Sequence, residues 1–232
     1  MCIVCDPSRR EEMEAATVLD CYGCPDVTHI PLLPKLTYVN CSQCPLLISI
    51  PVLPNLTHLY CNRCPLLKNL PVLPAVENVS CYECPLLTTL SAMPLLGRLD
   101  CFFCPLLATI PVLPALQILD CFECPVLALI PPLPNLAYLD CSGCPSLVAL
   151  PTLPTLNTLW CDPWIDHPLN KRFPAARQAA LTLERRRLKK LRYVRFKKFI
   201  STPAYSAYLN APGHVGHRIE TAQLRKLGSA RT

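Results

Sequence analysis

Pairs of cysteines separated by two residues recur every 20 residues from Cys21 to Cys144, and Cys161 continues the series. A fixed period without insertions or deletions is typical of solenoid proteins, in which each repeat contributes one turn of a coil. One turn of this length cannot bury its own apolar face, so consecutive turns have to stack. The period therefore predicts a stacked coil over residues 16–164, with about seven to eight repeats.

A representative repeat, residues 36–55, reads LTYVNCSQCPLLISIPVLPN. It matches the leucine-rich pattern L-x-x-L-x-L-x-x-N/C-x-L, whose five slots are filled by Leu36, Val39, Cys41, Cys44 and Leu46. Successive side chains of a strand point to opposite faces, so Val39 and Cys41 should face inward, and Tyr38 and Asn40 outward. The sequence thus predicts a leucine-rich-repeat solenoid with short parallel β-strands on its concave face.

The second half of each repeat contains two prolines within four residues, as in Ile50-Pro-Val-Leu-Pro54. Proline has no backbone N–H and disfavours the helical conformation of the residue before it, so a helix is excluded here. We expect an extended, polyproline-like convex side, with Ile50 and Leu53 anchoring it to the core.

The motif L-P-x-L-P-x-L-x-x-L-x-C resembles the short repeats of bacterial secreted leucine-rich-repeat effectors. It is also similar to the cysteine-rich repeats of leucine-rich-repeat proteins in giant DNA viruses. The resemblance covers about two thirds of the chain and implies a scaffold that binds other molecules. Some bacterial relatives carry a ubiquitin-ligase domain with a catalytic cysteine, but the tail after Trp164 is too short for that domain and has no cysteine.

Sixteen of the 17 cysteines form eight C-x-x-C pairs when Cys2 and Cys5 are included. Such pairs occur in zinc sites and redox motifs. Here both members of each repeated pair occupy inward slots, where cysteine behaves as a small buried hydrophobe and the second thiol can serve turn carbonyls. We therefore expect core cysteines and no metal site or cofactor, with metal binding between adjacent turns or disulfides as alternatives. Cys2 and Cys5 fit a degenerate first turn.

Outward positions of the predicted strands form columns that are candidates for partner binding. Asp100, Asp120 and Asp140 should stack on consecutive turns, where their repulsion would favour a cationic partner or a metal ion. Phe102, Phe103 and Phe122 are large aromatics at positions predicted to be exposed, and aromatics are enriched at binding hot spots. The alternatives without a binding role are that the aspartates are merely solvated and that the aromatics pack on one another. The full candidate set is Tyr38, Tyr60, Tyr82, Arg98, Asp100, Phe102, Phe103, Asp120, Phe122, Tyr138, Asp140 and Trp160.

The two ends of the solenoid should carry caps. Residues 1–15 are predicted to form an N-terminal cap containing a short helix over Asp6–Ala16, with Pro7 at its start and a capping box of Ser8 and Glu11. At the other end, Trp160, Pro163 and Trp164 are expected to close the last turn.

Residues 165–232 form a basic tail, expected to be mainly helical. They contain 16 Lys/Arg and 3 Asp/Glu, a net charge of +13, whereas residues 1–164 contain 6 and 13, a net charge of −7. Apolar residues between Pro174 and Ile200 fall near helical spacing. The tail could contact a protein or the solenoid itself, a nucleic acid or an anionic membrane. Its candidate contact residues are Arg185, Arg186, Arg187, Lys189, Lys190, Arg192, Arg195, Lys197 and Lys198. His214 and His217 are expected to lie in a solvated loop.

No arrangement of nucleophile, base and acid typical of an enzyme is visible, so we predict a non-enzymatic scaffold that binds a protein partner through the concave face, with no small-molecule substrate. The competing interpretations are a structural or particle-associated protein and a nucleic-acid or membrane contact through the tail. Met1–Arg10 lacks the apolar stretch of a signal peptide, and no run approaches the ~18 apolar residues of a membrane span. An intracellular, reducing compartment is therefore expected.

Overall fold

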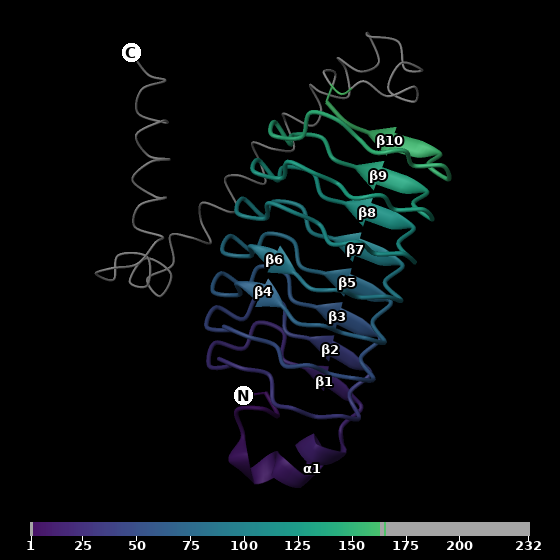
Figure 1. The fold of residues 1–232 in the computed structure, drawn as a ribbon. Coiled ribbons are helices and arrows are strands. Elements are labelled where there is room, and N and C mark those ends of the chain that lie inside the picture. Colours follow the sequence, from purple (N-terminus) through teal and green to yellow (C-terminus); the bar gives the residue numbers. More distant parts are fainter. Residues whose placement is uncertain (1, 163–164, 166–232) are drawn as a thin grey trace, which may run out of the picture. The chain divides into compact units, whose positions relative to one another are not determined.

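The structure is a computed structural model that describes residues 2–162 and residue 165. The chain divides into two units, residues 1–174 and 175–232, of which the second lies outside the described residues. The described part of the first unit is a stack of turns, each 20 residues long and each contributing one short strand to the main sheet (Figure 1). The predicted basic helical tail also lies outside the described residues.

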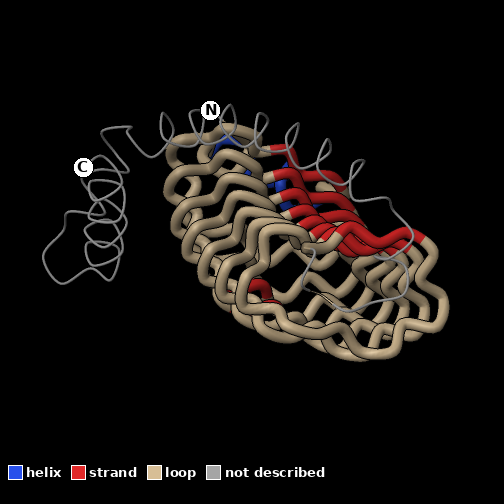
Figure 2. Tube along the Cα trace, turned by 90° about the horizontal axis from the view of Figure 1, so that it is seen from above, coloured by secondary structure: helices blue, strands red, loops and turns tan. Residues whose placement is uncertain are grey.

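Eight parallel strands form the main sheet, in the order β1-β2-β3-β5-β7-β8-β9-β10. Every strand pairs with the residues 20 positions away, for example Val39 with Leu59, so the register repeats the sequence period. Viewed along the stack, all of these strands lie on one side of the coil (Figure 2). Their bounds are Val18–Asp20, Tyr38–Asn40, His58–Tyr60, Asn78–Ser80, Arg98–Asp100, Ile118–Asp120, Tyr138–Asp140 and Thr158–Trp160.

The opposite side of the coil has a minor ladder in place of helices. Strand β4 (Asn69–Leu70) pairs in parallel with β6 (Thr89–Leu90), and isolated bridges join His29 to Ser49 and Thr109 to Leu129 at the equivalent positions. In the described part of the chain no helix forms in the proline-containing half of a repeat. The predicted anchors are confirmed, since Ile50 and Leu53 are both buried. The fold is therefore a leucine-rich-repeat-like solenoid of parallel strands.

The predicted alternation of side chains along the strands is confirmed. Val39 and Cys41 are fully buried, while Tyr38 and Asn40 are half-buried on the outer surface. The core is a single continuous cluster of leucine, isoleucine, valine and cysteine side chains that runs through every turn. Stability therefore comes from contacts between neighbouring turns, as expected for a solenoid.

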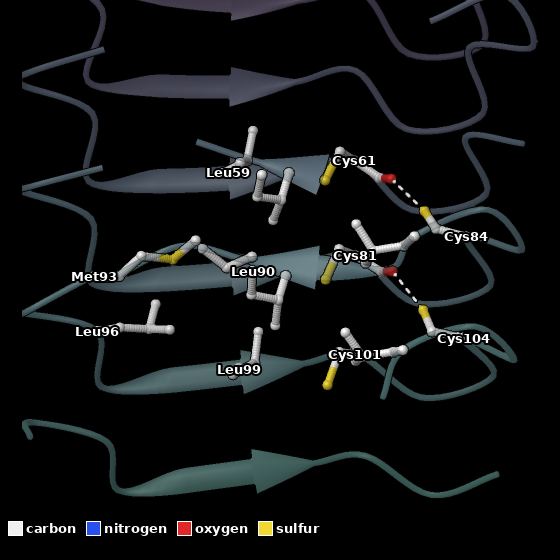
Figure 3. Close-up of a cluster of buried hydrophobic side chains, with 14 of the residues drawn as sticks. Leu59, Cys61, Cys81, Cys84, Leu90, Met93, Leu96, Leu99, Cys101 and Cys104 are labelled. Atoms are coloured by element: carbon white, nitrogen blue, oxygen red, sulfur yellow. Dashed lines mark hydrogen bonds between the residues drawn. The ribbon is translucent and has the colours of Figure 1, made fainter. Parts of the chain in front are cut away.

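The paired cysteines have two different roles in this core (Figure 3). The first thiol of each repeated pair lies in the core, where Cys61, Cys81 and Cys101 are fully buried. From Cys44 onward, the second thiol donates a hydrogen bond to a carbonyl of the preceding turn: Cys84 Sγ lies 3.2 Å from the Cys61 oxygen, and Cys104 Sγ lies 3.3 Å from the Cys81 oxygen. These bonds satisfy backbone acceptors that would otherwise be buried without a partner. All cysteines in the structure are free thiols.

The prediction that Leu46 fills the last apolar slot of the repeat is wrong. Leu46 is 38% exposed, whereas the following Leu47 is fully buried. Cys44 to Leu47 form a turn closed by a hydrogen bond from the Leu47 N–H to the Cys44 oxygen, with Pro45 second in the turn. That turn directs Leu46 outward and returns Leu47 to the core. A comparison of the repeats could have identified the core position. In the seventh repeat the residue equivalent to Leu46 is Ser146, whereas the residue equivalent to Leu47 is still a leucine, Leu147.

The N-terminal cap contains a 3-10 helix, Pro7–Arg9, followed by α1, Arg10–Ala15. The predicted capping box does not form. Asp6 caps this segment instead, because its Oδ1 accepts hydrogen bonds from the Ser8 backbone N–H at 3.0 Å and the Ser8 hydroxyl at 2.6 Å. Aspartate is as good a capping residue as serine. Because the 3-10 helix begins at Pro7, Asp6 rather than Ser8 precedes the first helical residue.

The turn between paired cysteines requires a left-handed residue. In each Cys-x-x-Cys segment from Cys21 to Cys144, the residue before the second cysteine has a positive φ. Only the first and the seventh of these segments have glycine there, Gly23 and Gly143. The other five turns place a larger side chain in this conformation, which costs an L-residue about 1–2 kcal/mol. These residues are Gln43, Arg63, Glu83, Phe103 and Glu123.

We expect Gln43→Gly to be more stable than Gln43→Ala by about 1 kcal/mol. Both variants lose the 2.6 Å hydrogen bond from Gln43 to the Tyr22 hydroxyl, so the difference between them isolates the backbone. At an ordinary extended position the order would be reversed, because glycine loses more entropy on folding. Chemical denaturation of the two variants measures the difference, and equal stabilities would contradict the strain.

Candidate interaction surface

The main sheet presents a continuous outer surface that we call the strand face. It consists of the first and third residues of the eight strands and of the two residues between the paired cysteines. Backbone hydrogen bonds between turns hold the second group in register, as in the 3.0 Å bond from the Phe103 N–H to the Phe122 oxygen. Side chains 20 residues apart are therefore neighbours on this face.

Four rings on consecutive turns form an aromatic ladder, which comprises Tyr82, Phe102, Phe103 and Phe122. The Phe102 ring stacks on Tyr82 and on Phe122, with centroid distances of 4.4 and 4.6 Å and interplanar angles of 6° and 9°. Phe103 packs edge-on against Phe102 at 5.9 Å and Phe122 at 5.1 Å. All four side chains remain half-buried. The predicted aromatic positions are thus brought together, and the rings also pack on one another.

Phe103 occupies an unfavourable backbone position within this ladder. Its φ is +54°, a conformation rarely adopted by bulky residues, whereas Gly143 fills the equivalent position two turns later. The contacts with Phe102 and Phe122 offset this strain. The same conformation recurs at Gln43, Arg63, Glu83 and Glu123, so it is a property of the repeat.

A shallow polar depression of about 320 Å³ lies on the N-terminal half of the strand face. The rings of Tyr38 and Tyr60 meet within it at 5.6 Å, and Tyr38 also stacks on His58 at 6.4 Å. Burial raises the pKa of Tyr38, and the neighbouring Tyr60 adds to the shift. The complete lining is Tyr22, Tyr38, Asn40, Ser42, Gln43, Tyr60, Asn62, Arg63 and Tyr82.

Arg63 joins the depression to the aromatic ladder. Its guanidinium donates two hydrogen bonds to the Glu83 carboxylate, at 3.0 and 3.2 Å, and lies 5.8 Å from the centre of the Tyr82 ring. The hydrogen bond to Glu83 raises the pKa of Arg63. Arg63 and Gln43 were missed as site residues. Both residues directly precede the second cysteine of a pair, at the position that Phe103 holds in its own repeat. This equivalence could have identified them from the sequence.

The three aspartates of the acidic column lie in register, as predicted: Asp100 pairs with Asp120, and Asp120 with Asp140. Their exposure differs from the prediction. Asp140 is only 3% exposed, because its Oδ1 accepts hydrogen bonds from the backbone and hydroxyl of Ser142 at 3.2 and 2.6 Å. Asp100 accepts a 3.1 Å bond from Arg98. Asp100 and Asp140 are thus hydrogen-bonded within their own strand and turn, and the assignment of the column to a partner stays a prediction.

The remaining predicted residues lie at the C-terminal end of the strand face. Tyr138 and Trp160 are half-buried on β9 and β10, and Trp160 is adjacent to Asp140 in the sheet register. Asp162 completes the last turn, because its carboxylate accepts hydrogen bonds from the N–H groups of Gly143 and Cys144 at 2.7 and 3.2 Å. Pro163, Trp164, the candidate tail residues and His214 and His217 lie outside the described residues.

A second apolar column lies away from the strand face, on the proline-containing segments. Leu32, Val52, Val72 and Val112 occupy equivalent positions and are 68%, 50%, 48% and 60% exposed. These isolated side chains stand on separate turns and carry no ring stacking. They offer a matched surface for control substitutions.

No protein-family model matches the chain, and no curated protein matches it in sequence. Among solved structures, it is similar to the crystal structure of a leucine-rich cell surface protein from Faecalibacterium prausnitzii. The identity is 16% and the TM-score 0.35, with 68% of this chain and 54% of that protein covered. The chain thus spans about half the length of that protein. Within the described residues, no helix is both long and apolar enough to cross a membrane.

Proposed function

We propose that this protein is a non-enzymatic scaffold that binds a protein partner through the strand face. The aromatic ladder is the observation that carries the proposal. Stacked rings present a rigid apolar surface that loses little side-chain entropy when a partner covers it.

The overall charge of the solenoid favours a partner with an apolar anchor and basic side chains. Glu83 and Asp100, beside the ladder, are already paired with Arg63 and Arg98 and do not supply this attraction. Residues 1–164 have a net charge of −7, from 6 Lys/Arg and 13 Asp/Glu. Such a surface attracts a cationic partner, while the central rings supply most of the affinity.

The state of the repeat thiols supports a non-enzymatic role. Burial raises the pKa of Cys44 to about 11 and that of Cys84 to about 12. A nucleophilic cysteine requires the thiolate, which forms readily only when the pKa is lowered. These thiols instead donate hydrogen bonds within the core.

The decisive experiment compares two triple variants of the intact protein as affinity baits. Phe102→Ala/Phe103→Ala/Phe122→Ala removes the ladder, and Val52→Ser/Val72→Ser/Val112→Ser removes exposed apolar side chains elsewhere. We expect a partner to be captured by the unmodified protein and the valine variant and lost from the phenylalanine variant, because hot-spot aromatics dominate binding energy. Circular dichroism confirms that each bait is folded. Equal capture by the phenylalanine variant would contradict the proposal.

The basic tail supports a second contact, with an anionic partner such as a nucleic acid or a membrane surface. Its net charge of +13, from 16 Lys/Arg and 3 Asp/Glu, is the observation behind this proposal. Binding by phosphate neutralisation weakens steeply with salt. Deleting residues 171–200 should remove salt-sensitive retention on nucleic acid, and retention that persists would exclude the tail. Presence in purified particles would instead support the structural role that the viral resemblance implies.

A further inference from the structure

Three sulfur atoms meet at the N-terminal end of the solenoid. Cys5 Sγ lies 3.7 Å from Cys2 Sγ and 3.6 Å from Cys24 Sγ, and all three sulfurs are within 4.8 Å of one another. Cys2 and Cys5 are half-buried, so the group is open to solvent on one side. Within the described residues, no other group of this kind forms.

Cys24 differs from every later cysteine at the same repeat position. From Cys44 onward, the second thiol of each pair donates to a carbonyl of the preceding turn, beginning with Cys44 Sγ to the Cys21 oxygen at 3.0 Å. Cys24 belongs to the first turn and faces thiols instead. The chain before it, with a 3.0 Å hydrogen bond from the Cys5 N–H to the Cys2 oxygen, turns back to deliver two more sulfurs.

Spacing alone does not single out this group. Fifteen residues separate Cys5 from Cys21, and 16 separate Cys24 from Cys41, so both arrangements match zinc-binding spacings. The two arrangements differ in geometry, because the second thiol of each pair from Cys44 onward donates a hydrogen bond to a backbone carbonyl. Tetrahedral zinc with Zn–S bonds of about 2.3 Å places its sulfurs about 3.8 Å apart, close to the distances around Cys5. A disulfide would require about 2.05 Å.

Structural zinc sites use four ligands, whereas sites with three protein ligands keep a water molecule in the fourth position. Cys21 is not among the sulfurs that lie within 4.8 Å of one another. Cys2, Cys5 and Cys24 therefore supply three ligands, and the fourth position is left to a water molecule.

We propose that Cys2, Cys5 and Cys24 bind one Zn²⁺ ion, with a water molecule in the fourth position, and that this ion closes the N-terminal end of the solenoid. Each ligating thiol releases its proton to solvent when the metal binds. The site departs from the expectation that all cysteines are core residues, and it gives Cys2 and Cys5 a role other than a degenerate turn. It also supplies the end cap that an open stack requires.

The test uses the full-length protein, reduced, freed of metal and then titrated with Zn²⁺ against a chromophoric chelator. We expect one tightly bound ion per chain and, with Co²⁺ in place of Zn²⁺, a thiolate charge-transfer band in the near ultraviolet. Cys2→Ser/Cys5→Ser should lose both signals. The control Cys101→Ala/Cys104→Ser removes two thiols from another turn and should keep them, with circular dichroism verifying that each variant is folded.

Thermal unfolding provides a second measurement. Adding chelator should lower the midpoint of the unmodified protein and leave that of Cys2→Ser/Cys5→Ser unchanged, because a ligand stabilises only the folded state that binds it. The proposal is overturned if the reduced protein binds no zinc, or if the double variant binds it equally. A Cys5–Cys24 disulfide with no zinc binding after reduction would also overturn it.

Discussion

Leu47→Ala is expected to lower the free energy of unfolding by about 2–5 kcal/mol, whereas Leu46→Ala should lower it by less than about 1 kcal/mol. The two leucines are adjacent in the chain, yet Leu47 is fully buried and Leu46 is 38% exposed. Truncating Leu47 removes core contacts and leaves a cavity between stacked turns. Truncating Leu46 removes a side chain that already faces solvent.

Chemical denaturation of both variants measures this difference directly. The pair is its own control, because both substitutions remove the same atoms from one Cys-Pro-Leu-Leu segment. The leucine-rich pattern predicts the opposite order, with Leu46 as the core residue. A larger loss for Leu46→Ala would therefore restore the pattern and contradict the turn seen between Cys44 and Leu47.

The solenoid is expected to be stable at pH 8 and to unfold near pH 10. Burial raises the pKa of Cys84 from its ordinary value of 9.0 to about 12, and raises the pKa of other core thiols well above 9.0. These thiols stay protonated in the folded protein but ionise above pH 9 once unfolded. The pKa of Cys44 is raised less, to about 11. Ten other fully buried cysteines show the larger shift: Cys41, Cys61, Cys64, Cys81, Cys84, Cys101, Cys104, Cys121, Cys124 and Cys141.

The sign follows from the raised pKa of the folded state. Each thiol contributes its full stabilisation below pH 9, and this contribution is lost as the pH rises toward the folded pKa, about 12 for Cys84. The loss is about 1.4 kcal/mol per pH unit for each thiol. Ten such groups outweigh the typical stability of a domain, about 5–15 kcal/mol, within roughly one pH unit.

Urea denaturation at pH 7, 8, 9 and 10 tests this expectation. The matched variant Cys61→Ala/Cys101→Ala should lose stability less steeply above pH 9, by about 1.4 kcal/mol per pH unit for each thiol removed. Unchanged stability of the original protein at pH 10 would show that the core thiols do not remain protonated.

The sequence alone determined the features that repeat. Because the cysteines recur every 20 residues, the stacking register, the inward Val39 and Cys41, and the outward Tyr38 follow from alternation along a strand. The neighbouring Phe102 and Phe122 follow from the same period, since equal positions in stacked turns are adjacent. One-dimensional order is enough to place such residues, because each turn contacts only its neighbours.

Tertiary structure decided what happens where the repeat turns or ends. The Cys-Pro-Leu-Leu turn, through its backbone conformation, places Leu47 rather than Leu46 in the core. Asp140 is buried, and its carboxylate accepts hydrogen bonds from Ser142 in its own turn. Cys24 faces Cys5 because the first turn has no earlier repeat whose carbonyl its thiol could reach. The period can be read directly from the sequence. The backbone dihedrals of the turns and the contacts of the first turn, which has no repeat before it, depend on interactions that form only in the folded chain.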